Sequence, residues 1–297
     1  SAPAADHEPF QWNRFFPDRE VETIPSGECT AAIRAALDRD QPDAVAIVGY
    51  VRPESLAALR WSRTNGAPLI LMSESQEIDH PRVWWKEAIK RRRLRHVHAA
   101  LVGGPSHRAY LVKLGVPNGR IVLGYNAVDN AFYHNAAERA RRDPSSREGK
   151  PQRPYFLAVN RFEPEKNLLG LLRAYSQYRG LVGDAEAWDL VLCGDGRQRP
   201  ALVQFITEHR LEPFVHLPGF LQMEELASWY ALAGAFVHPS FMEPWGLVVN
   251  EAAACRTPLL VSDRAGCAET LVPHQHESAG FRFDPLSLPA IRDTLVA

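Results

Sequence analysis

Short apolar segments alternate with segments of helical periodicity along most of the chain. In the first half, four continuous apolar runs predict strands buried on both faces, because they lack the alternation of a half-solvated strand. Helical segments separate the runs, which predicts a parallel sheet with right-handed crossovers. The predicted strands are residues 44–50, 68–74, 99–104 and 120–126, and the predicted helices are residues 30–39, 53–64, 82–95 and 105–114.

The same pattern begins again after a polar stretch. Residues 138–153 (ERARRDPSSREGKPQR) have almost no apolar content and carry Pro, Ser and Gly, which is typical of a linker. We therefore predict two Rossmann-like α/β domains, over residues 1–150 and 151–297. In the second domain the predicted strands are residues 155–160, 190–194, 215–217, 235–238, 258–262 and 281–283, and the predicted helices are residues 167–178, 199–209, 223–232 and 246–255.

Composition and charge narrow the class of protein. Of 297 residues, 45% are hydrophobic and 23% charged, which excludes a disordered or collagen-like chain. The net charge of −1 gives no global excess of positive charge for nucleic acid, although residues 1–150 carry +4 and residues 151–297 carry −5. The four cysteines form no CxxC pair, which indicates a reducing compartment and a cytoplasmic protein. No apolar run approaches the roughly 18 residues of a membrane span.

Arg161 and Lys166 follow the first predicted strand of the second domain. Two cations around a helix start, together with free helix N–H groups, suit a diphosphate: Arg161 as a planar fork and Lys166 as a point charge. Alone, this spacing favours the alternative, a solvated turn in which Glu163 and Glu165 are ion-pair partners.

Gly194 and Asp195 follow the next predicted strand, in the sequence Gly-Asp-Gly. Glycines at this position allow a ligand or a second backbone to come close, or simply form a tight turn. The sequence contains no GxGxxG, which argues against a dinucleotide-dependent dehydrogenase.

Glu243 and Glu251 are separated by seven residues after the strand at 235–238. We expect Glu243 in a loop, where it could accept hydrogen bonds from sugar hydroxyls. Glu251 lies two turns into an otherwise apolar helix, where it could hold a ribose diol. The N–H groups of Gly246 and Leu247 open that helix and would face a phosphate. The alternative is an acidic loop followed by a surface glutamate, which the apolar character of the helix disfavours.

In their order and spacing, these motifs resemble the retaining GT-B glycosyltransferases of the family-four type, the glycosyl transferases of group 1. The resemblance covers residues 155–285 and continues more weakly through residues 42–129. It predicts two Rossmann-like domains whose parallel sheets face each other across a cleft. The matching elements are Arg161 with Lys166, Gly194-Asp195-Gly196, Leu217-Pro-Gly-Phe220, Pro239-Ser240 with Glu243, Gly246-Leu247, Glu251 and Gly266-Cys-Ala-Glu269-Thr.

The resemblance implies a hexosyltransferase of carbohydrate biosynthesis whose donor is a nucleotide-diphosphate sugar. UDP and GDP are the nucleotides that we expect first. It implies that Arg161 and Lys166 bind the diphosphate, that Glu243 holds the donor sugar, and that Glu251 holds the ribose. It places Gly194, Asp195, Phe220, Leu221, Gly246 and Leu247 around the nucleotide. It implies no metal and no cofactor beyond the donor, since cations and helix dipoles replace the metal. It also implies that the donor phosphate, and not a pair of carboxylates, assists deprotonation of the acceptor.

Both ends of the chain depart from the family pattern. The first domain is entered late, near residues 20–28, without the family's opening strand and Gly-rich loop, and the chain stops at Ala297; we expect both termini to be truncated. An impaired nucleotide-sugar-binding paralogue or fragment, and another GT-B enzyme such as a sugar epimerase, therefore stay open as alternatives. The acceptor, whether a saccharide, a lipid-linked sugar or a small molecule, is not indicated by the sequence.

A basic segment with aromatic residues lies in the first domain. Residues 86–95 (KEAIKRRRLR) contain six cations and one acid, and Trp84 and Trp85 precede them. Residues 84–95 could make weak contact with an anionic membrane, at the inner face of the cytoplasmic membrane, or could be a solvated helix face with one tryptophan in the core.

Overall fold

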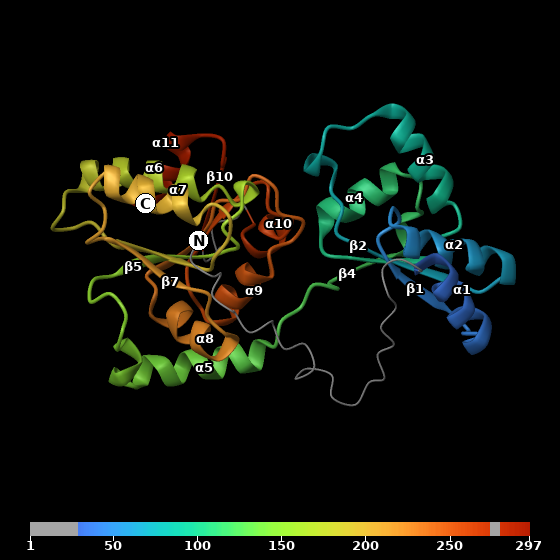
Figure 1. Ribbon diagram of the computed structural model, residues 1–297, viewed down its shortest axis with the longest axis horizontal. Coiled ribbons are helices and arrows are strands. Elements are labelled where there is room, and N and C mark those ends of the chain that lie inside the picture. The colour runs from blue at the N-terminus through green and yellow to red at the C-terminus, as the bar shows by residue number, and fades with distance from the viewer. Residues whose placement is uncertain (1–28, 274–279) are drawn as a thin grey trace, which may run out of the picture. The chain divides into compact units, whose positions relative to one another are not determined.

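The structure is a computed structural model that describes residues 29–273 and 280–297 (Figure 1). The predicted entry into the first domain near residues 20–28 lies outside these residues. The described residues form two compact units. The first contains the described part of Ser1–Ser73 with Trp84–Leu101 and Leu114–Val122, and the second contains the described parts of Glu74–Val83, Val102–Lys113 and Leu123–Ala297.

The first half of the chain forms a four-stranded sheet. Its order is β1-β2-β3-β4, and β1 pairs with β2 in parallel, with Val45 opposite Leu69. The continuous apolar runs form the predicted strands, but the expected burial on both faces is not found in this sheet. Burial alternates along β1, where Val48 is 66% exposed, and along β2 and β3, so one face of the sheet is less covered than the other. The strands are β1 (Val45–Val48), β2 (Leu69–Ser73), β3 (Ala99–Val102) and β4 (Ile121–Leu123), and the helices are α1 (Cys29–Asp40), α2 (Pro53–Asn65), α3 (Trp84–Leu94) and α4 (Pro105–Lys113).

The second half forms a six-stranded parallel sheet of order β10-β9-β8-β5-β6-β7. Helices α6, α7 and α11 cover one face, and α5, α8 and α9 cover the other (Figure 1). The strands are β5 (Tyr155–Val159), β6 (Asp189–Cys193), β7 (Val215–Gly219), β8 (Ala235–His238), β9 (Leu259–Ser262) and β10 (Gly280–Phe283). The helices are α5 (Asn130–Arg142), α6 (Leu168–Val182), α7 (Arg199–Glu208), α8 (Met223–Leu232), α9 (Leu247–Ala254), α10 (Ala268–Leu271) and α11 (Leu288–Val296).

The predicted α/β class and the predicted strands are confirmed, but the polar stretch at 138–153 is not extended throughout. It begins inside α5, which Asp129 caps by accepting a hydrogen bond from the Phe132 N–H. Tyr133, Ala137 and Ala140 are buried at helical spacing where α5 packs against α8 and α9, so a narrow stripe of mostly small side chains anchors a mostly polar helix. The division of domains at 1–150 and 151–297 stays a prediction.

Short 3-10 turns complete the described fold. They are η2 (Glu77–Asp79), η3 (Asn118–Arg120), η4 (Pro144–Arg147) and η5 (Pro164–Lys166). Because the strands of the second sheet are parallel, the loops that follow β5, β6, β7 and β8 all lie at the carboxyl ends of the strands. Ligands bind at this end of such sheets. None of the described helices is long and apolar enough to cross a membrane.

Candidate functional site

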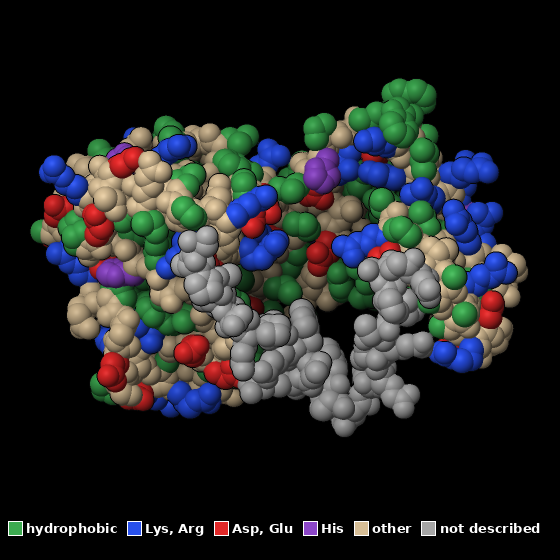
Figure 2. Space-filling view, viewed as in Figure 1, with side chains coloured by type: hydrophobic (Ala, Val, Ile, Leu, Met, Phe, Trp, Pro, Cys, Tyr) green, Lys and Arg blue, Asp and Glu red, His purple; other side chains and the backbone are tan. Residues whose placement is uncertain are grey.

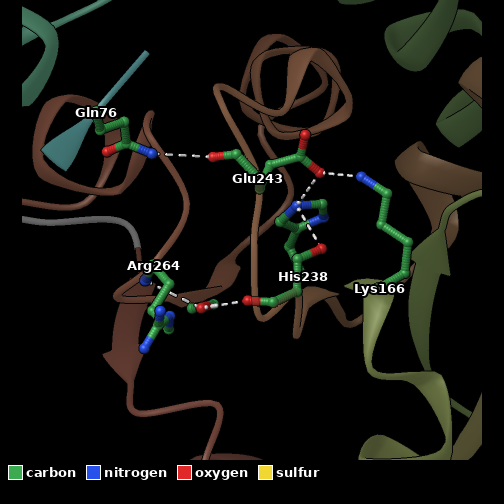
Figure 3. Close-up of polar contacts among 7 residues, drawn as sticks. Gln76, Lys166, His238, Glu243 and Arg264 are labelled. Atoms are coloured by element: carbon green, nitrogen blue, oxygen red, sulfur yellow. Dashed lines mark hydrogen bonds and ion pairs between the residues drawn. The ribbon is translucent and has the colours of Figure 1, made fainter. Parts of the chain in front are cut away.

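Glu243 is the centre of a polar cluster beyond the ends of β5 and β8 (Figure 3). The Lys166 ammonium forms an ion pair with its Oε2 atom, and each of the two side chains is only 12% exposed. The Nε2 atom of His238 lies 3.0 Å from the same oxygen and 3.2 Å from Ser240 Oγ. A carboxylate only accepts hydrogen bonds, so His238 Nε2–H is the donor. Two donors therefore converge on one carboxylate oxygen.

The surroundings of Glu243 set its protonation state. Burial by itself would raise the pKa of this carboxyl group. The hydrogen bond and charge interaction with His238, and the Lys166 ammonium, outweigh burial and lower the pKa to about 2. Glu243 is therefore ionised at neutral pH and carries a fixed negative charge within the site.

The backbone around Glu243 is held from segments far away in sequence. Gln76 Nε2 donates to the Glu243 carbonyl oxygen (3.2 Å), and the Gly266 N–H donates to the same atom (2.9 Å). The fully buried His107 accepts from the Gly104 N–H through Nδ1 (3.1 Å), so Nε2–H donates to the Pro244 carbonyl (2.7 Å). His107 is thus a structural clamp on the Glu243 loop.

The loop and the β5 turn are also joined directly. The Phe241 N–H donates to the Glu165 carbonyl (2.8 Å), and Arg264 Nε donates to the Phe241 carbonyl (2.8 Å; Figure 3 shows Arg264). Lys166 and Glu243 therefore lie on two turns with a fixed relative position.

Gly246 turns the chain from this loop into α9. Its φ of +99° favours glycine, and an added Cβ atom would lie 3.2 Å from Glu243 Cγ. Leu247 is the first residue of the helix, and the first N–H groups of a helix have no acceptor within it. The positive end of α9 thus begins beside the Glu243 carboxylate.

Glu251 lies further along α9 and is tied to aromatic hydroxyl groups. Its Oε2 atom accepts a hydrogen bond from the Tyr230 hydroxyl of α8 (2.8 Å). Burial raises the pKa of Glu251, and hydrogen bonds from Tyr230 and from Tyr133 of α5 lower it in part. The expectation that Glu251 lies close to a buried face agrees with these contacts.

The remaining predicted residues lie at the ends of neighbouring strands. Gly194 has a φ of +125°, and a Cβ atom there would lie 1.9 Å from the Asn160 carbonyl oxygen, so this turn requires glycine. Asp195 Oδ1 accepts from the Gly196 N–H (2.7 Å). Phe220 follows β7 and is 44% exposed, whereas Leu221 packs on the core cluster below.

Arg161 follows β5 and is exposed. Its guanidinium makes no hydrogen bond or ion pair with residues 29–273 or 280–297. The structure thus joins Lys166 to Glu243 and leaves Arg161 outside that pair.

Three residues of the cluster were not found from the sequence: His238, Gln76 and Arg264. The signal for His238 was a histidine at the end of an apolar strand, five residues before Glu243. Gln76 and Arg264 gave no signal, because their contacts with the loop link distant segments.

Comparison with known proteins identifies a family whose match includes the predicted residues of the candidate site. Residues 140–294, more than half of the chain, match the family described as glycosyl transferases group 1. The chain belongs to this family. The resemblance inferred from the motifs is therefore confirmed, and the matched residues include every predicted site residue.

The alignments with curated relatives cover about half of the chain. The O-antigen chain mannosyltransferase B of Escherichia coli is 33% identical over 138 residues, 46% of this chain and 34% of the relative. A glycogen synthase of Mycobacterium tuberculosis is 32% identical over 150 residues, 50% of this chain and 33% of the relative. The alignments thus span about a third of the length of these relatives.

Solved structures extend the likeness to nearly the whole chain. Anabaena Alr3699/HepE in complex with UDP superposes with a TM-score of 0.71 at 18% identity, covering 90% of this chain and 71% of that one. The sucrose-phosphate synthase of Thermosynechococcus elongatus gives 0.70 at 20% identity, covering 94% and 71%. This group 1 glycosyl transferase therefore has the GT-B type of fold, with two parallel sheets.

Proposed function

We propose that this protein is a retaining, metal-independent glycosyltransferase that moves a sugar from a nucleotide-diphosphate sugar to an acceptor hydroxyl group. The observation that carries the proposal is the Lys166–Glu243 ion pair beside the N-terminus of α9. It puts a cation, an ionised carboxylate and helix N–H groups together. These are the groups needed to bind a sugar joined to a diphosphate.

The diphosphate would lie between Lys166 and the N–H groups of Gly246 and Leu247. The positive end of a helix and a partly buried ammonium both favour phosphate oxygens. Arg161, exposed at the end of β5, would add a bidentate contact from the solvent side. These cations would stabilise the negative charge that develops on the leaving nucleotide, which is the task of a metal ion in other transferases.

The donor sugar would be held by Glu243. An ionised carboxylate with a pKa of about 2 accepts hydrogen bonds from sugar hydroxyl groups and is a poor general acid at neutral pH. When the diphosphate binds, it competes for the Lys166 ammonium, and Glu243 is then free to accept from the sugar.

The nucleoside would lie along the ends of β6 and β7 and over α9. We assign the ribose to Glu251, whose Oε2 is already oriented by Tyr230. The backbone at Gly194, Asp195, Phe220 and Leu221 would line the base. A uridine donor is favoured by the likeness to Anabaena Alr3699/HepE, which has been solved with UDP and with UDP-glucose; a guanosine donor is the second candidate.

In the transfer step, the bond between the anomeric carbon and the diphosphate oxygen breaks, and the acceptor oxygen bonds to the same face of that carbon. The acceptor proton passes to a phosphate oxygen of the leaving nucleotide. Configuration is retained, and no oxidant or reductant is needed. Saccharides, lipid-linked sugars and small molecules all offer the hydroxyl group that this step requires.

Calorimetric titration of the full chain tests the assignment. We expect UDP or GDP to bind, and Lys166→Met to weaken binding by about 30-fold, as loss of one charge-assisted contact requires. Lys113→Met is the matched control, since Lys113 also pairs with a glutamate, but with the exposed Glu77 and not with Glu243. Equal binding by the two variants would overturn the diphosphate site.

Turnover is measured separately from binding. The protein is incubated with the donor and a library of acceptors, and NMR determines the anomeric configuration of the product. We expect the product to have the anomeric configuration of the donor, and the rate of sugar transfer to be unchanged by EDTA. Inversion, or loss of the rate with EDTA, would contradict the proposed mechanism. Donor binding without transfer to any acceptor would favour the impaired paralogue.

A further inference from the structure

Helix α3 of the first unit is unusually exposed. Every residue of α3 is described, and among them Leu94 alone is buried, whereas Trp84 is 83%, Trp85 48% and Ile89 43% exposed. Large apolar side chains on the surface of a helix indicate an interaction site when they lie together. In this helix they occupy the first half.

Arginines surround a cavity between α3 and α2. The cavity has a volume of about 190 Å³. Among the residues described, Arg60, Arg63 and Arg92 have no acidic partner, and Arg93 donates only to the Tyr50 carbonyl (3.3 Å). The lining of the cavity combines the apolar side chains Leu56, Leu59 and Ile89 with Arg60, Arg63, Arg92 and Arg93.

Within residues 29–273 and 280–297, acidic side chains do not neutralise the positive charge of this surface. Glu87 is the one acid in the sequence of α3, and it pairs with Lys90 (2.7 Å). Burial lowers the pKa of His96 just beyond the helix, and Arg63, Arg95 and Arg92 lower it further. In Figure 2, lysine and arginine side chains gather over α2 and α3, with hydrophobic side chains beside them. Like charges repel, so this cluster is best explained by an anionic partner.

We propose that α2 and α3 form a docking surface for an anionic phospholipid membrane. Trp84 and Trp85 would enter the headgroup region, where an indole ring has both apolar and polar surroundings. Arg60, Arg63 and Arg92 would contact lipid phosphates, with the apolar floor of the cavity beneath them. Exposed aromatic and apolar side chains next to basic ones favour a lipid surface over nucleic acid, for which the charges alone would suffice.

Co-sedimentation of the full chain with vesicles tests this proposal. The vesicles are phosphatidylcholine alone or with added phosphatidylglycerol. We expect binding only to the anionic vesicles, and a loss of binding in high salt because charges at a surface are screened. Arg63→Gln with Arg92→Gln should lower the partition coefficient by roughly 30-fold, since each basic residue near a membrane contributes about 1 kcal/mol.

Matched variants distinguish binding through this surface from non-specific electrostatic or hydrophobic binding to the vesicles. Arg139→Gln with Arg142→Gln removes the same charge from α5 and should leave binding unchanged. Trp84→Ala should reduce the quenching of tryptophan fluorescence by brominated lipids, whereas Phe281→Ala, which removes exposed aromatic area from β10, should preserve it.

Four outcomes would overturn the proposal. These are equal binding to neutral vesicles, equal loss in both arginine pairs, release by millimolar inorganic phosphate at constant ionic strength, and binding to RNA but not to vesicles. The measurement uses neither donor nor turnover, so its outcome is independent of the proposed transferase activity.

Discussion

His238 Nε2 donates a hydrogen bond of 3.0 Å to Glu243 Oε2, the same oxygen that Lys166 contacts. His238 is fully buried, and its Nδ1 atom has no hydrogen-bond partner within the described residues. This histidine, at the end of β8, therefore fixes the Glu243 carboxylate, while Lys166 contacts the same carboxylate from the turn that follows β5. In the proposed function, His238 would remain the donor to this carboxylate, whereas the diphosphate would compete for Lys166.

Replacement of Lys166 should affect stability as well as donor binding. Lys166→Met leaves a largely buried carboxylate with one donor fewer, and we expect the free energy of unfolding to fall by about 2 kcal/mol. Urea denaturation at pH 7 measures the change. Lys113→Met, at an ion pair whose side chains are about half exposed, should change it by less than about 1 kcal/mol. Equal losses would mean that the buried pair adds nothing beyond a surface pair.

The ionisation of Glu243 predicts how stability depends on pH. Its pKa in the folded protein, about 2, is below the ordinary value of 4.5. The stability that the ionised Glu243 contributes is therefore fully present above pH 4.5 and is lost as the pH falls toward 2. The difference between the two pKa values corresponds to about 3 kcal/mol of unfolding free energy. The difference in unfolding free energy between the native protein and Glu243→Gln should be constant from pH 6 to 7 and should shrink below 4.5. A difference independent of pH down to acid unfolding would contradict this prediction.

Glu251 should show the opposite dependence. Burial raises its pKa in the folded protein, so the contribution of the protonated group is present below 4.5 and is lost as the pH rises through the raised value. Glu251→Gln should therefore gain stability relative to the native protein as the pH rises. Urea denaturation of both glutamate variants in one pH series measures the two slopes, and slopes of equal sign would refute the assigned environments.

Gly194 tests the close approach of the β5 and β6 turns. In Gly194→Ala the Cβ atom would meet the Asn160 carbonyl at 1.9 Å, with φ at +125°, and we expect a loss of more than about 3 kcal/mol. Gly183→Ala is the control, because φ is +86° there and no atom lies within 4 Å of the added Cβ. It should lose about 1–2 kcal/mol from backbone strain alone. Thermal unfolding of both variants compares them, and equal losses would mean that the turn relaxes.

Much of the fold could be predicted from the sequence, because continuous apolar runs form its strands. Strands β5, β6, β8 and β9 of the second sheet are buried almost throughout, as such runs predict, whereas β1 of the first sheet is buried on one face only. The predicted bounds of α8 and β8 match the structure, and every predicted strand is present. Helix α5 was not predicted, because its buried stripe consists mainly of small alanines within a charged segment. Its helical form depends on packing against α8, which no local pattern indicates.

The candidate site was determined by the sequence in its residue types and in their order along the chain. Lys166, Glu243 and Glu251 were predicted because each follows a strand, in the order that the resemblance to the group 1 glycosyl transferases implies. Only the tertiary structure decided which of them meet. Strand β8 pairs with β5, although β6 and β7 lie between them in the sequence, and this pairing puts the Glu243 loop beside Lys166 and leaves Glu251 with Tyr230. Periodicity reports whether a strand is buried but carries no information on which strand lies next to it, so the partners of Glu243 became known only from the folded chain.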